Sequence, residues 1–575
     1  MIVERSGNAM HRVTKMTDAL SQVTQFTYDL NGNLLTVADA ESHTTTYTYD
    51  SMDRLKTRKD PLPAHPAETY DYDPAGNLTR VVDRKGQVTS FQYDTLNRRV
   101  QAIYADATTT LNYDAVGRLS RTSDTASGAG TIEFAYDVLD RLAQETTGLG
   151  TVACQYDVLG RRTQMVANGQ QPTTYQYDAA SRLTRVAQGS VFAALGYDNA
   201  DRRTSLGYSN GTSTSYAYDL ASRLTNITHT GPSGVIDAVT YTYDAAGNRL
   251  AANRASGTAS LLPTAVASAI YDSANEQTQF AGAALQYDAN GNLINDGVNT
   301  YQWDARNRLV AISGGSIATF NYDAFGRRTN RTINGVVSQF LCDKNDIVAE
   351  IGGGAVGASY LRSLTLDEPY IRQTSIGSEH YHLDGLNSSL VLSNSQGGAS
   401  TTYAYEPFGR MISTGVSSNT FQFTGRENDG TGNYSYRARY YHPRFQRFIN
   451  EDPIGIRGGI NFYGYASQNP LIFRDPTGLI DWPSIIPHVA NSADAATNIV
   501  SETGPGEYYA AAIGGAIGGV AFSPFGPWAA AVGSIIGANA AGLVGSAFDN
   551  PCAGSLNCQE IVPLIIGDSP KGGRK

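Results

Sequence analysis

The sequence is poor in cysteine, and this scarcity excludes two kinds of small scaffold. Its 575 residues include four cysteines, Cys154, Cys342, Cys552 and Cys558. They are too few and too scattered for a disulfide-stapled fold or a structural zinc site. Only Cys552 and Cys558 are close in sequence; they could close a small loop after export, and two free thiols are the alternative.

Clusters of lysine and arginine are also missing, apart from the terminal KGGRK. The formal net charge is -10 and the pI is about 5.3, whereas contacts with phosphate groups need grouped positive charge. We therefore expect no nucleic-acid partner. The N-terminal MIVERSGNAMHRV has no apolar core that could serve as a signal peptide, so export would need another route.

Tyrosine, in contrast, is abundant, with 35 residues against 6 methionines. One pattern recurs as far as about Phe340: an alternating strand, Tyr-Asp, two variable residues, a small or turn-forming residue, and usually Arg-Leu. Examples are TTTYTYDSMDRL, TLNYDAVGRL and STSYAYDLASRL. The copies follow one another at roughly twenty residues, a period typical of repeat architectures. They include those at Tyr28, Tyr49, Tyr72, Tyr93, Tyr113, Tyr136, Tyr156, Tyr177, Tyr197 and Tyr218.

Each copy has the chemistry of a β-hairpin. Pairs such as Tyr47 and Tyr49 are two residues apart, so in a strand both rings point to one face. The Asp that follows, with Gly, Asn or Ser, favours a turn, and the Arg-Leu segment begins the return strand. A hairpin cannot bury its aromatic face alone, so the units should stack into a mainly β array. The repeated Tyr, Asp and Arg residues are interpreted as structural.

With these motifs the chain resembles the RHS/YD-repeat family, which includes bacterial RHS effectors, the C component of insecticidal toxin complexes and the teneurin shell. The resemblance covers about residues 15–479. It extends through HYHLDGLNSSLVLSNSQG, TTYAYEPFGR and FTGRENDGTGNYSYRARYYHPRFQRFINEDPIG, which are similar to the family's core-associated segment. It implies a continuous β-sheet that spirals into a hollow cocoon.

The resemblance divides the chain into three parts: repeats at 1–340, a core-associated segment with a self-cleaving junction at 341–479, and a variable cargo at 480–575. Two departures from the family pattern affect the first part. The chain starts almost inside a repeat, and family shells are usually longer, with N-terminal plug or delivery modules. The shell is therefore expected to be incomplete, to need a partner chain, or to come from a truncated gene.

The junction contains two Asp-Pro pairs, at Asp452 and Asp475. Two carboxyl groups that share one proton can cut a peptide bond, since one activates water while the other polarises the carbonyl. The residues alone favour ordinary turns here. The resemblance assigns catalysis to Asp452 and Asp475 with Arg439, and places the cut between Leu479 and Ile480. Arg437 ranks second to Arg439, and this self-cleavage is the only enzymatic activity that we expect.

Other candidate sites are weaker. His380 and His382 in HYH alternate on a strand without a convincing set of further ligands, so no metal is expected, and no cofactor either. His442 and Cys342 are interpreted as core or surface residues.

The tail after Leu479 has a different composition. From Tyr508 to Phe548 it has no charged residue, and SPFGP interrupts the apolar sequence. As a helix, Trp528 to Phe548 would be about 30 Å long, enough to span a bilayer core, and small residues recur at four-residue spacing, as in close-packed membrane helices. We expect a helical hairpin that permeabilises membranes. A buried soluble core, a translocation aid and a degenerate remnant are the alternatives, and an enzymatic toxin is less supported.

Two functions follow. The first is an RHS-type effector whose shell encloses a toxin and releases it by aspartyl self-cleavage. It would be made in the bacterial cytoplasm and exported by a dedicated secretion system; its partners would be its own cargo, an immunity protein, the secretion apparatus or a missing shell chain, and a target membrane. The second is a shell without proteolysis that acts in cell contact or carbohydrate binding.

Overall fold

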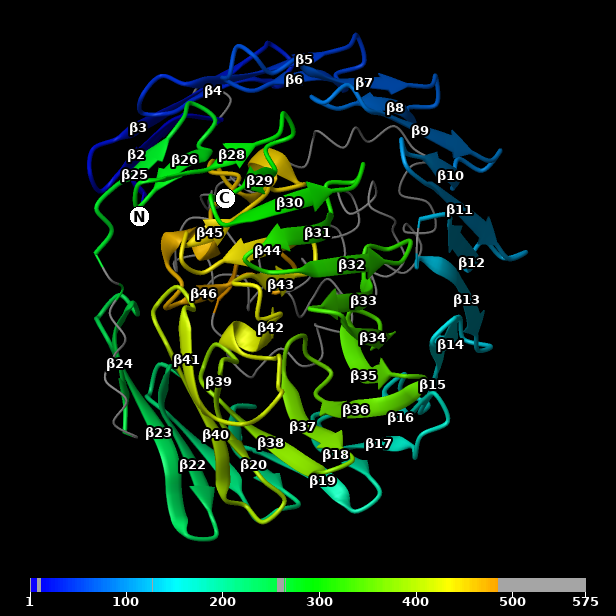
Figure 1. Ribbon diagram of the computed structural model, residues 1–575, viewed down its shortest axis with the longest axis vertical. Coiled ribbons are helices and arrows are strands. Elements are labelled where there is room, and N and C mark those ends of the chain that lie inside the picture. The colour runs from blue at the N-terminus through cyan, green and yellow to red at the C-terminus, as the bar shows by residue number, and fades with distance from the viewer. Residues whose placement is uncertain (1, 8–11, 127, 256–262, 264, 484–575) are drawn as a thin grey trace, which may run out of the picture.

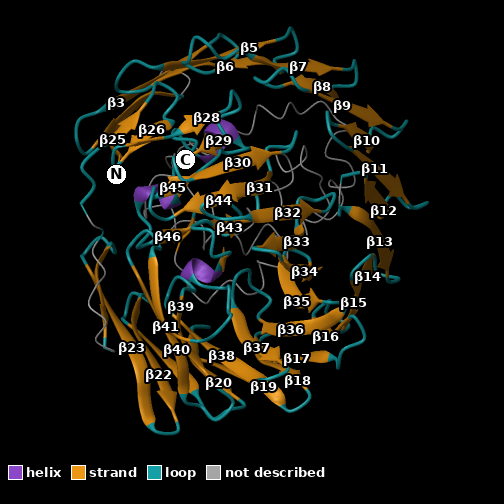
Figure 2. Cartoon of the chain, in the orientation of Figure 1, coloured by secondary structure: helices purple, strands orange, loops and turns teal. Residues whose placement is uncertain are grey.

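The computed structural model describes residues 2–7, 12–126, 128–255, 263 and 265–483. These residues form β-strands and the turns and loops between them, as Figure 2 shows, and three short 3-10 turns are the only helical segments among them. The C-terminal cargo and its expected helical hairpin lie outside the described residues, apart from the first few positions after Leu479. No helix in the described part of the chain is long and apolar enough to cross a membrane.

The Tyr-Asp unit folds as the predicted hairpin. In one copy, β5 (Thr44–Tyr49) leads into a turn and returns as β6 (Leu55–Lys59). The Oδ1 atom of Asp50 accepts hydrogen bonds from the backbone N–H groups of Met52, at 2.9 Å, and Arg54, at 3.0 Å. Its Oδ2 atom accepts one from Nε of Arg54 at 2.7 Å. One carboxylate therefore fixes both the turn and the arginine that begins the return strand.

The same residues connect neighbouring hairpins. The hydroxyl of Tyr49 donates to the carbonyl oxygen of Leu34, in the preceding hairpin, at 2.9 Å. The guanidinium of Arg54 stacks on the ring of Tyr72, in the next hairpin, at 4.6 Å. Equivalent hydroxyl bonds are donated by Tyr28, Tyr72, Tyr93, Tyr113, Tyr136, Tyr156, Tyr177, Tyr197, Tyr218 and Tyr243. These contacts agree with the structural interpretation of the repeated residues.

Stacked hairpins form a first sheet of 24 strands, in which each strand pairs antiparallel with the next in sequence. In Figure 1 this sheet curves around the rest of the described chain, from blue at the top through cyan to green at the lower left. Besides β5 and β6, its strands are β1 (Ile2–Gly7), β2 (Val13–Asp18), β3 (Val23–Tyr28), β4 (Leu34–Ala38), β7 (Glu68–Tyr72), β8 (Leu78–Val82), β9 (Val88–Tyr93), β10 (Arg99–Ile103), β11 (Thr108–Tyr113), β12 (Leu119–Asp124), β13 (Gly130–Tyr136), β14 (Leu142–Thr147), β15 (Gly150–Tyr156), β16 (Arg162–Ala167), β17 (Thr173–Tyr177), β18 (Leu183–Gln188), β19 (Val191–Tyr197), β20 (Arg203–Tyr208), β21 (Ser213–Tyr218), β22 (Leu224–Gly231), β23 (Gly234–Tyr243) and β24 (Arg249–Arg254).

A second sheet of 14 strands continues the same hairpin pattern. Its strands are β28 (Gln286–Tyr287), β29 (Leu293–Asn295), β30 (Asn299–Trp303), β31 (Leu309–Gly314), β32 (Ala318–Tyr322), β33 (Arg328–Ile333), β34 (Val336–Asp343), β35 (Asp346–Gly352), β36 (Ala355–Arg362), β37 (Pro369–Thr374), β38 (Gly377–Leu383), β39 (Ser389–Ser393), β40 (Ala399–Tyr405) and β41 (Met411–Gly415). A small sheet of β25 (Ala269–Tyr271), β26 (Gln277–Phe280) and β27 (Ala283–Ala284) precedes it.

The second sheet packs against the first as the next turn of a spiral. Their shared core includes Val186 of the first sheet with Leu361 and Tyr370 of the second, all nearly inaccessible to solvent. Buried ion pairs join the two sheets along this seam; they are Arg306 with Asp124 at 2.6 Å, Arg327 with Glu145 at 2.6 Å, Arg162 with Asp343, and Arg203 with Glu368. The predicted spiralling β-shell is thus confirmed.

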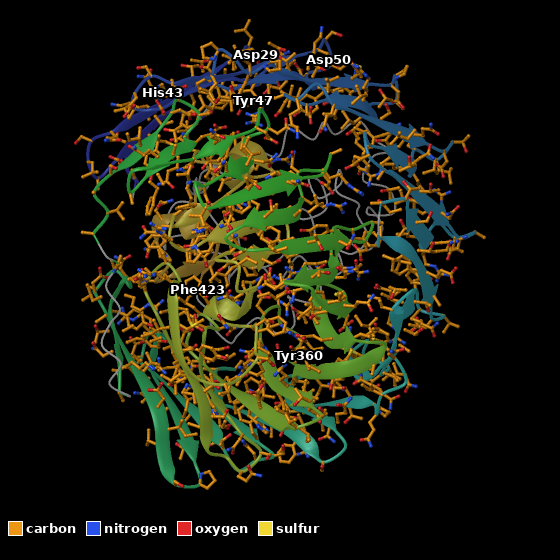
Figure 3. All side chains as sticks on the ribbon, viewed as in Figure 1. Asp29, His43, Tyr47, Asp50, Tyr360 and Phe423 are labelled. Atoms are coloured by element: carbon orange, nitrogen blue, oxygen red, sulfur yellow. The ribbon has the colours of Figure 1, made fainter. Side chains whose placement is uncertain are left out.

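The remaining segment folds inside the two sheets, in yellow and orange in Figure 1. Its elements are the 3-10 turns η1 (Phe423–Gly425), η2 (Gly455–Gly458) and η3 (Ala466–Gln468) and the short strands β42 (Glu427–Asn428), β43 (Tyr434–Tyr436), β44 (Arg439–His442), β45 (Arg447–Phe448), β46 (Phe473–Arg474) and β47 (Trp482–Pro483). Figure 3 shows Phe423 in this interior, whereas Asp29 and Asp50 lie on the outer sheet. An aromatic core that includes Tyr436, Tyr441, Phe448 and Tyr465 fixes the segment.

Candidate functional site

Arg439 joins the two aspartates of the junction. It begins β44, and its side chain is 3% exposed. Its Nη2 atom lies 2.9 Å from Oδ2 of Asp452 and 3.1 Å from Oδ2 of Asp475. A single guanidinium nitrogen therefore bridges two buried carboxyl groups, and the fold brings together the three residues that the resemblance assigned to catalysis.

Asp452 is held by its own backbone and by the turn after it. Its N–H donates to the carbonyl oxygen of Phe462 at 2.9 Å, and its Oδ1 atom accepts from the N–H of Ile454 at 3.0 Å. Gly458 lies against the carboxyl group, since a Cβ atom there would be 2.2 Å from Oδ2 of Asp452. A glycine is thus the residue that lets the turn close over this acid.

Asp475 lies against the predicted cleavage bond. Its Oδ1 atom accepts hydrogen bonds from the N–H groups of Leu479, at 3.0 Å, and Ile480, at 3.2 Å, and from the hydroxyl of Thr477 at 3.3 Å. Because the nitrogen of Ile480 belongs to the Leu479–Ile480 peptide bond, one oxygen of this carboxyl group touches the bond directly. Leu479 is buried, whereas Ile480 is 42% exposed.

Gly478, in the turn before the predicted cleavage bond, packs closely against Tyr436 and Arg439. Gly478 has a φ of 72°, in the region that favours glycine, and a Cβ atom there would be 2.4 Å from the carbonyl oxygen of Tyr436. Its own carbonyl oxygen accepts a hydrogen bond from Nε of Arg439. The guanidinium carbon of Arg439 lies 3.6 Å from the ring centre of Phe448, which covers its other face.

The two acids have raised pKa values for the same reason. Burial raises the pKa of Asp452 to about 7, against the lowering effect of Arg439, and the neighbouring Asp475 raises it further. Burial also raises the pKa of Asp475, against Arg439 and the N–H groups of Leu479 and Ile480. A pair in this environment favours one proton shared between two carboxyl groups near neutral pH.

A third acid, Asp481, belongs to the same cluster. Burial raises its pKa to about 7, and Asp475 raises it further, while the hydroxyl of Ser467 donates to its Oδ2 atom at 2.5 Å. Asp481 was not predicted from the sequence to be part of the site. Its position directly after Ile480, at the predicted cleavage bond, was the available signal.

Arg437 has a different role from Arg439. Its Nη2 atom contacts Asp367 at 2.7 Å and Asp346 at 2.9 Å, and its Nη1 atom donates to the carbonyl oxygen of Pro476. It therefore anchors the turn after Asp475 to the second sheet, and among the ion pairs of the described residues it joins neither Asp452 nor Asp475. The geometry agrees with the ranking of Arg439 above Arg437, and the catalytic assignment itself stays a prediction.

The histidines of HYH lie elsewhere, between the two sheets. His380 and His382 of β38 pack on the ring of Tyr208, with ring centres 5.5 and 5.7 Å away, and His382 is 5.1 Å from His229. Burial lowers the pKa of His229 to about 3 and that of His380 to about 4. Among the described residues, no three His, Cys, Asp or Glu side chains are grouped to hold a metal ion.

His442 is buried in the inner segment, and Cys342 is partly buried in β34 of the second sheet. His442 stacks on Phe445 with ring centres 3.9 Å apart. Burial raises the pKa of Cys342 to about 12, so its thiol stays protonated and unreactive at neutral pH. Cys552 and Cys558 lie outside the described residues.

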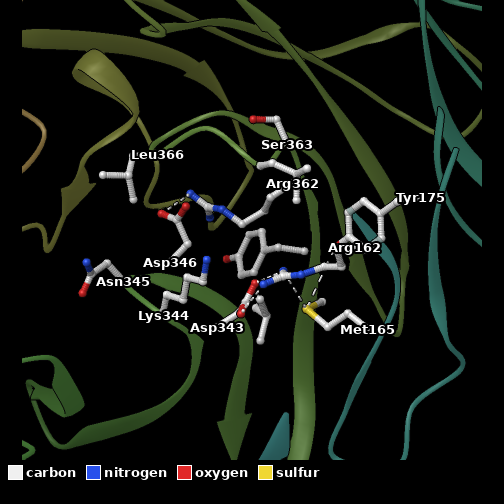
Figure 4. A pocket seen from close by; sticks show the side chains of 13 residues that line it. Arg162, Met165, Tyr175, Asp343, Lys344, Asn345, Asp346, Arg362, Ser363 and Leu366 are labelled. Atoms are coloured by element: carbon white, nitrogen blue, oxygen red, sulfur yellow. Dashed lines mark hydrogen bonds and ion pairs between the residues drawn. The ribbon is translucent and has the colours of Figure 1, made fainter. Parts of the chain in front are cut away.

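A small cavity opens at the seam between the sheets, as Figure 4 shows. It is lined by Arg162 of the first sheet and by Asp343, Asp346 and Arg362 of the second, and has a volume of about 30 Å³. It holds about one or two water molecules and is too small for an organic ligand. Arg437 donates to the carbonyl oxygen of Asn345 on the wall of this cavity, so the cavity borders the anchor of the cleavage turn.

Comparison with family models and known proteins gives a consistent result. The teneurin YD-shell model matches residues 203–470, and the RHS repeat model matches residues 8–41, 28–63, 72–109 and 113–152. A tRNA3(Ser)-specific nuclease WapA of Bacillus spizizenii is 29% identical over 260 residues, covering 42% of this chain and 11% of that protein. Toxin subunit YenC1 of Yersinia entomophaga is 26% identical over 275 residues, covering 42% of this chain and 26% of that protein.

Solved structures share the fold. The crystal structure of TcdB2-TccC3 matches 81% of this chain and 31% of its own, with a TM-score of 0.63 and 16% identity. The Tc holotoxin pore of Photorhabdus luminescens matches 83% of this chain and 34% of its own, with a TM-score of 0.56 and 15% identity. The chain thus spans between about a tenth and a third of the length of these proteins, and the structural likeness concerns the β-shell alone.

Proposed function

We propose that this chain, which belongs to the RHS/YD-repeat family, is the shell of a toxin-type effector that cuts itself between Leu479 and Ile480. The observation that carries the proposal is the set of contacts made by Asp475. One of its carboxyl oxygens accepts the N–H of Ile480, and the other shares Arg439 with Asp452. The guanidinium of Arg439 thus lies between the carboxyl groups of Asp452 and Asp475, and Asp475 also contacts the peptide bond to be cut.

The geometry supports a division of labour between the two acids. Asp475 accepts three hydrogen bonds at Oδ1, and such bonds favour its ionised form. The Oδ1 atom of Asp452 accepts a hydrogen bond from the N–H of Ile454, which favours the ionised form less than three such bonds do, so we assign the shared proton to Asp452. Asp475 is therefore the base that activates water, and Asp452 is the acid that polarises the carbonyl of Leu479.

The proton balance of the cut follows from these roles. Water adds to the carbonyl carbon of Leu479 as Asp475 takes one of its protons and Asp452 gives its proton to the carbonyl oxygen. Asp475 then passes its new proton to the nitrogen of Ile480, which its carboxyl oxygen already contacts at 3.2 Å. The carbon–nitrogen bond breaks, Asp452 regains its proton as the carbonyl reforms, and the products are a new C-terminal acid at Leu479 and a new amine at Ile480.

The intact mass of the purified full chain tests this proposal. We expect two species whose masses sum to the chain plus one water, with the break after Leu479. The chains with Asp452→Asn or Asp475→Asn should each give one uncut mass. A single uncut parent chain would favour the alternative, a YD-repeat shell that acts in cell contact or carbohydrate binding without proteolysis, and a glycan array would then test for sugar binding.

For the cargo at residues 480–575, we propose membrane permeabilisation, because the uncharged stretch from Tyr508 to Phe548 has the length and the small-residue spacing of a membrane hairpin. Dye release from liposomes by the cut full chain, with the uncut Asp475→Asn chain as control, tests this. The names of several relatives refer instead to tRNA nucleases and to a double-stranded DNA deaminase toxin. Cleavage of added tRNA or deamination of added DNA without dye release would replace the membrane activity by one on nucleic acid.

Delivery remains part of the proposal. We propose that the effector is made in the bacterial cytoplasm, that an immunity protein protects the producing cell, and that a secretion apparatus or a partner shell chain exports it. Co-purification of a neighbouring small protein with the uncut chain, and its loss when residues 480–575 are deleted, would support the immunity partner.

A further inference from the structure

Glu451, the residue before Asp452, forms ion pairs with two arginines in the N-terminal part of the chain. The carboxylate of Glu451 lies 2.8 Å from Nη2 of Arg58 and 2.8 Å from Nη2 of Arg84, and its second oxygen accepts from Nη1 of Arg84 at 3.0 Å. Arg58 belongs to β6 and Arg84 to the turn after β8, so both belong to hairpins of the first sheet, 393 and 367 residues from Glu451. The side chain of Glu451 is 9% exposed and that of Arg84 is 2% exposed.

Arg58 also contacts Phe462, a turn residue whose backbone binds Asp452. Its guanidinium lies 4.8 Å from the ring centre of Phe462. The carbonyl oxygen of Phe462 accepts hydrogen bonds from the N–H of Asp452, at 2.9 Å, and from Nη1 of Arg439, at 3.0 Å. One arginine of the first sheet thus contacts both neighbours that fix the backbone of the acid.

The ion pairs of Glu451 with Arg58 and Arg84 are buried, and each arginine has a further carboxylate partner. Arg58 also pairs with Glu68 at 3.2 Å, and Arg84 pairs with Asp60 and, at 3.4 Å, with Glu68. The two guanidinium groups lower the pKa of Glu451 against the effect of its burial. Buried pairs of this kind add little net stability but are costly to break, so they fix a geometry more than they strengthen a fold.

We propose that Glu451 is a positioning residue for self-cleavage. Held by Arg58 and Arg84, it keeps Asp452 against Arg439, so the chain is cut only after the first sheet has closed over the junction. This inference rests on the proposed self-cleavage and adds a condition to it: the toxin is separated from the shell only after the first sheet has packed over the junction.

A second buried ion pair, elsewhere in the chain, provides a control that distinguishes the positioning of Asp452 from a general loss of stability. Glu145 of the first sheet pairs with Arg327 of the second at 2.6 Å, and Arg327 keeps Asp323 as a second partner at 2.6 Å. In the same way, the loss of the Glu451 carboxylate leaves Arg58 with Glu68. The substitutions Glu451→Gln and Glu145→Gln therefore each remove the carboxylate of a buried ion pair between the first sheet and another part of the chain, but only Glu451 lies beside the site.

The test follows newly made full-length chain in a cell-free translation, with a radiolabel pulse and a chase at several pH values. We expect the parent and the Glu145→Gln chain to be cut at the same rate, and the Glu451→Gln chain to be cut about ten to a hundred times more slowly, since small displacements of a catalytic group have effects of this size. We expect Glu451→Asp, which keeps the charge, to restore most of the rate.

The dependence of the cleavage rate on pH is a second measurement, and a loss of stability alone would not shift it. Arg439 lowers the pKa of Asp452, so an Asp452 that moves away from Arg439 loses this effect. The upper limb of the profile of Glu451→Gln should therefore move to higher pH than that of the parent. If this chain does not fold, Arg58→Met, which leaves Glu451 with Arg84, should show the same slow cut and the same shift.

Each outcome separates the two proposals. An uncut parent overturns the self-cleavage and this inference together. A cut parent with Glu451→Gln or, where that chain fails to fold, Arg58→Met at the parental rate overturns only the inference, as does an equal slowing by Glu145→Gln.

Discussion

The carboxyl oxygen Oδ1 of Asp475 lies 3.2 Å from the backbone nitrogen of Ile480. This contact makes the acid part of the turn that carries the predicted cleavage bond, rather than a neighbour of it. The other oxygen of the same carboxyl group faces Arg439 and, through it, Asp452. The chemistry of the site can therefore be tested by changing one contact at a time.

The two acids should act as one unit. Asp452→Asn and Asp475→Asn are each expected to slow the cut by at least about a thousandfold, and the double variant should be no slower than either single one, because the residues share one proton. Gel quantification of full chain and fragments over time measures this. Additive effects of the two substitutions would contradict a shared role.

Arg439 and Arg437 should differ in their effect on the cut. Lysine at 439 cannot reproduce a guanidinium that bridges two carboxyl groups and holds the carbonyls of Phe462 and Gly478. We expect Arg439→Lys to slow the cut by about a hundredfold and Arg437→Lys by less than about tenfold. The same time course measures both, and the opposite order would transfer the role to Arg437.

Gly458 should be required because of its closeness to Asp452. A methyl group at this position would lie 2.2 Å from Oδ2 of Asp452 and would displace the carboxyl group from Arg439. We expect Gly458→Ala to reduce the cut by about tenfold or more with a thermal unfolding midpoint close to that of the parent. Gly207→Ala is the control, since a Cβ atom there meets nothing within 4 Å. Equal cleavage rates for Gly458→Ala and the parent would show that the loop moves to accommodate the methyl group without displacing Asp452 from Arg439.

The raised pKa of Asp452 predicts how stability depends on pH. In the unfolded chain this acid loses its proton near pH 4, whereas in the folded chain it does so at about 7. The folded state binds more protons in between, so the free energy of unfolding should fall as the pH rises from about 4 to 7, by up to about 4 kcal/mol from this group. The uncut Asp475→Asn chain should show part of this fall in a urea titration. The uncut Asp452→Asn chain, which lacks the group, should show a smaller one.

The buried histidines predict a change in the opposite direction. His229 and His380 have pKa values of about 3 and 4 in the folded chain, against about 6.5 when unfolded. The unfolded state therefore binds more protons below pH 6.5, and each histidine should cost about 2 kcal/mol of stability at pH 5. Thermal unfolding at pH 8 and pH 5 measures the loss, which should be smaller in His380→Gln. An unchanged loss in that variant would mean that other groups cause it.

Part of this protein could be predicted from the sequence because the relevant interactions are local. The spacing of Tyr47 and Tyr49, the turn chemistry of Asp50 and the return strand at Leu55 lie within about a dozen residues, and they specify the same hairpin in every copy. The resemblance carried by the Asp-Pro motifs then predicted which acids meet at the junction, and the structure places them on one guanidinium nitrogen.

Tertiary structure decided what depends on residues far apart in sequence. Glu451 reaches Arg58 and Arg84 only because the first sheet curves back over the junction. The repeat determines the hairpin but does not specify which turn of the spiral lies against which. That register depends on the packing of two whole sheets and on buried ion pairs between them, and no short stretch of sequence contains both partners.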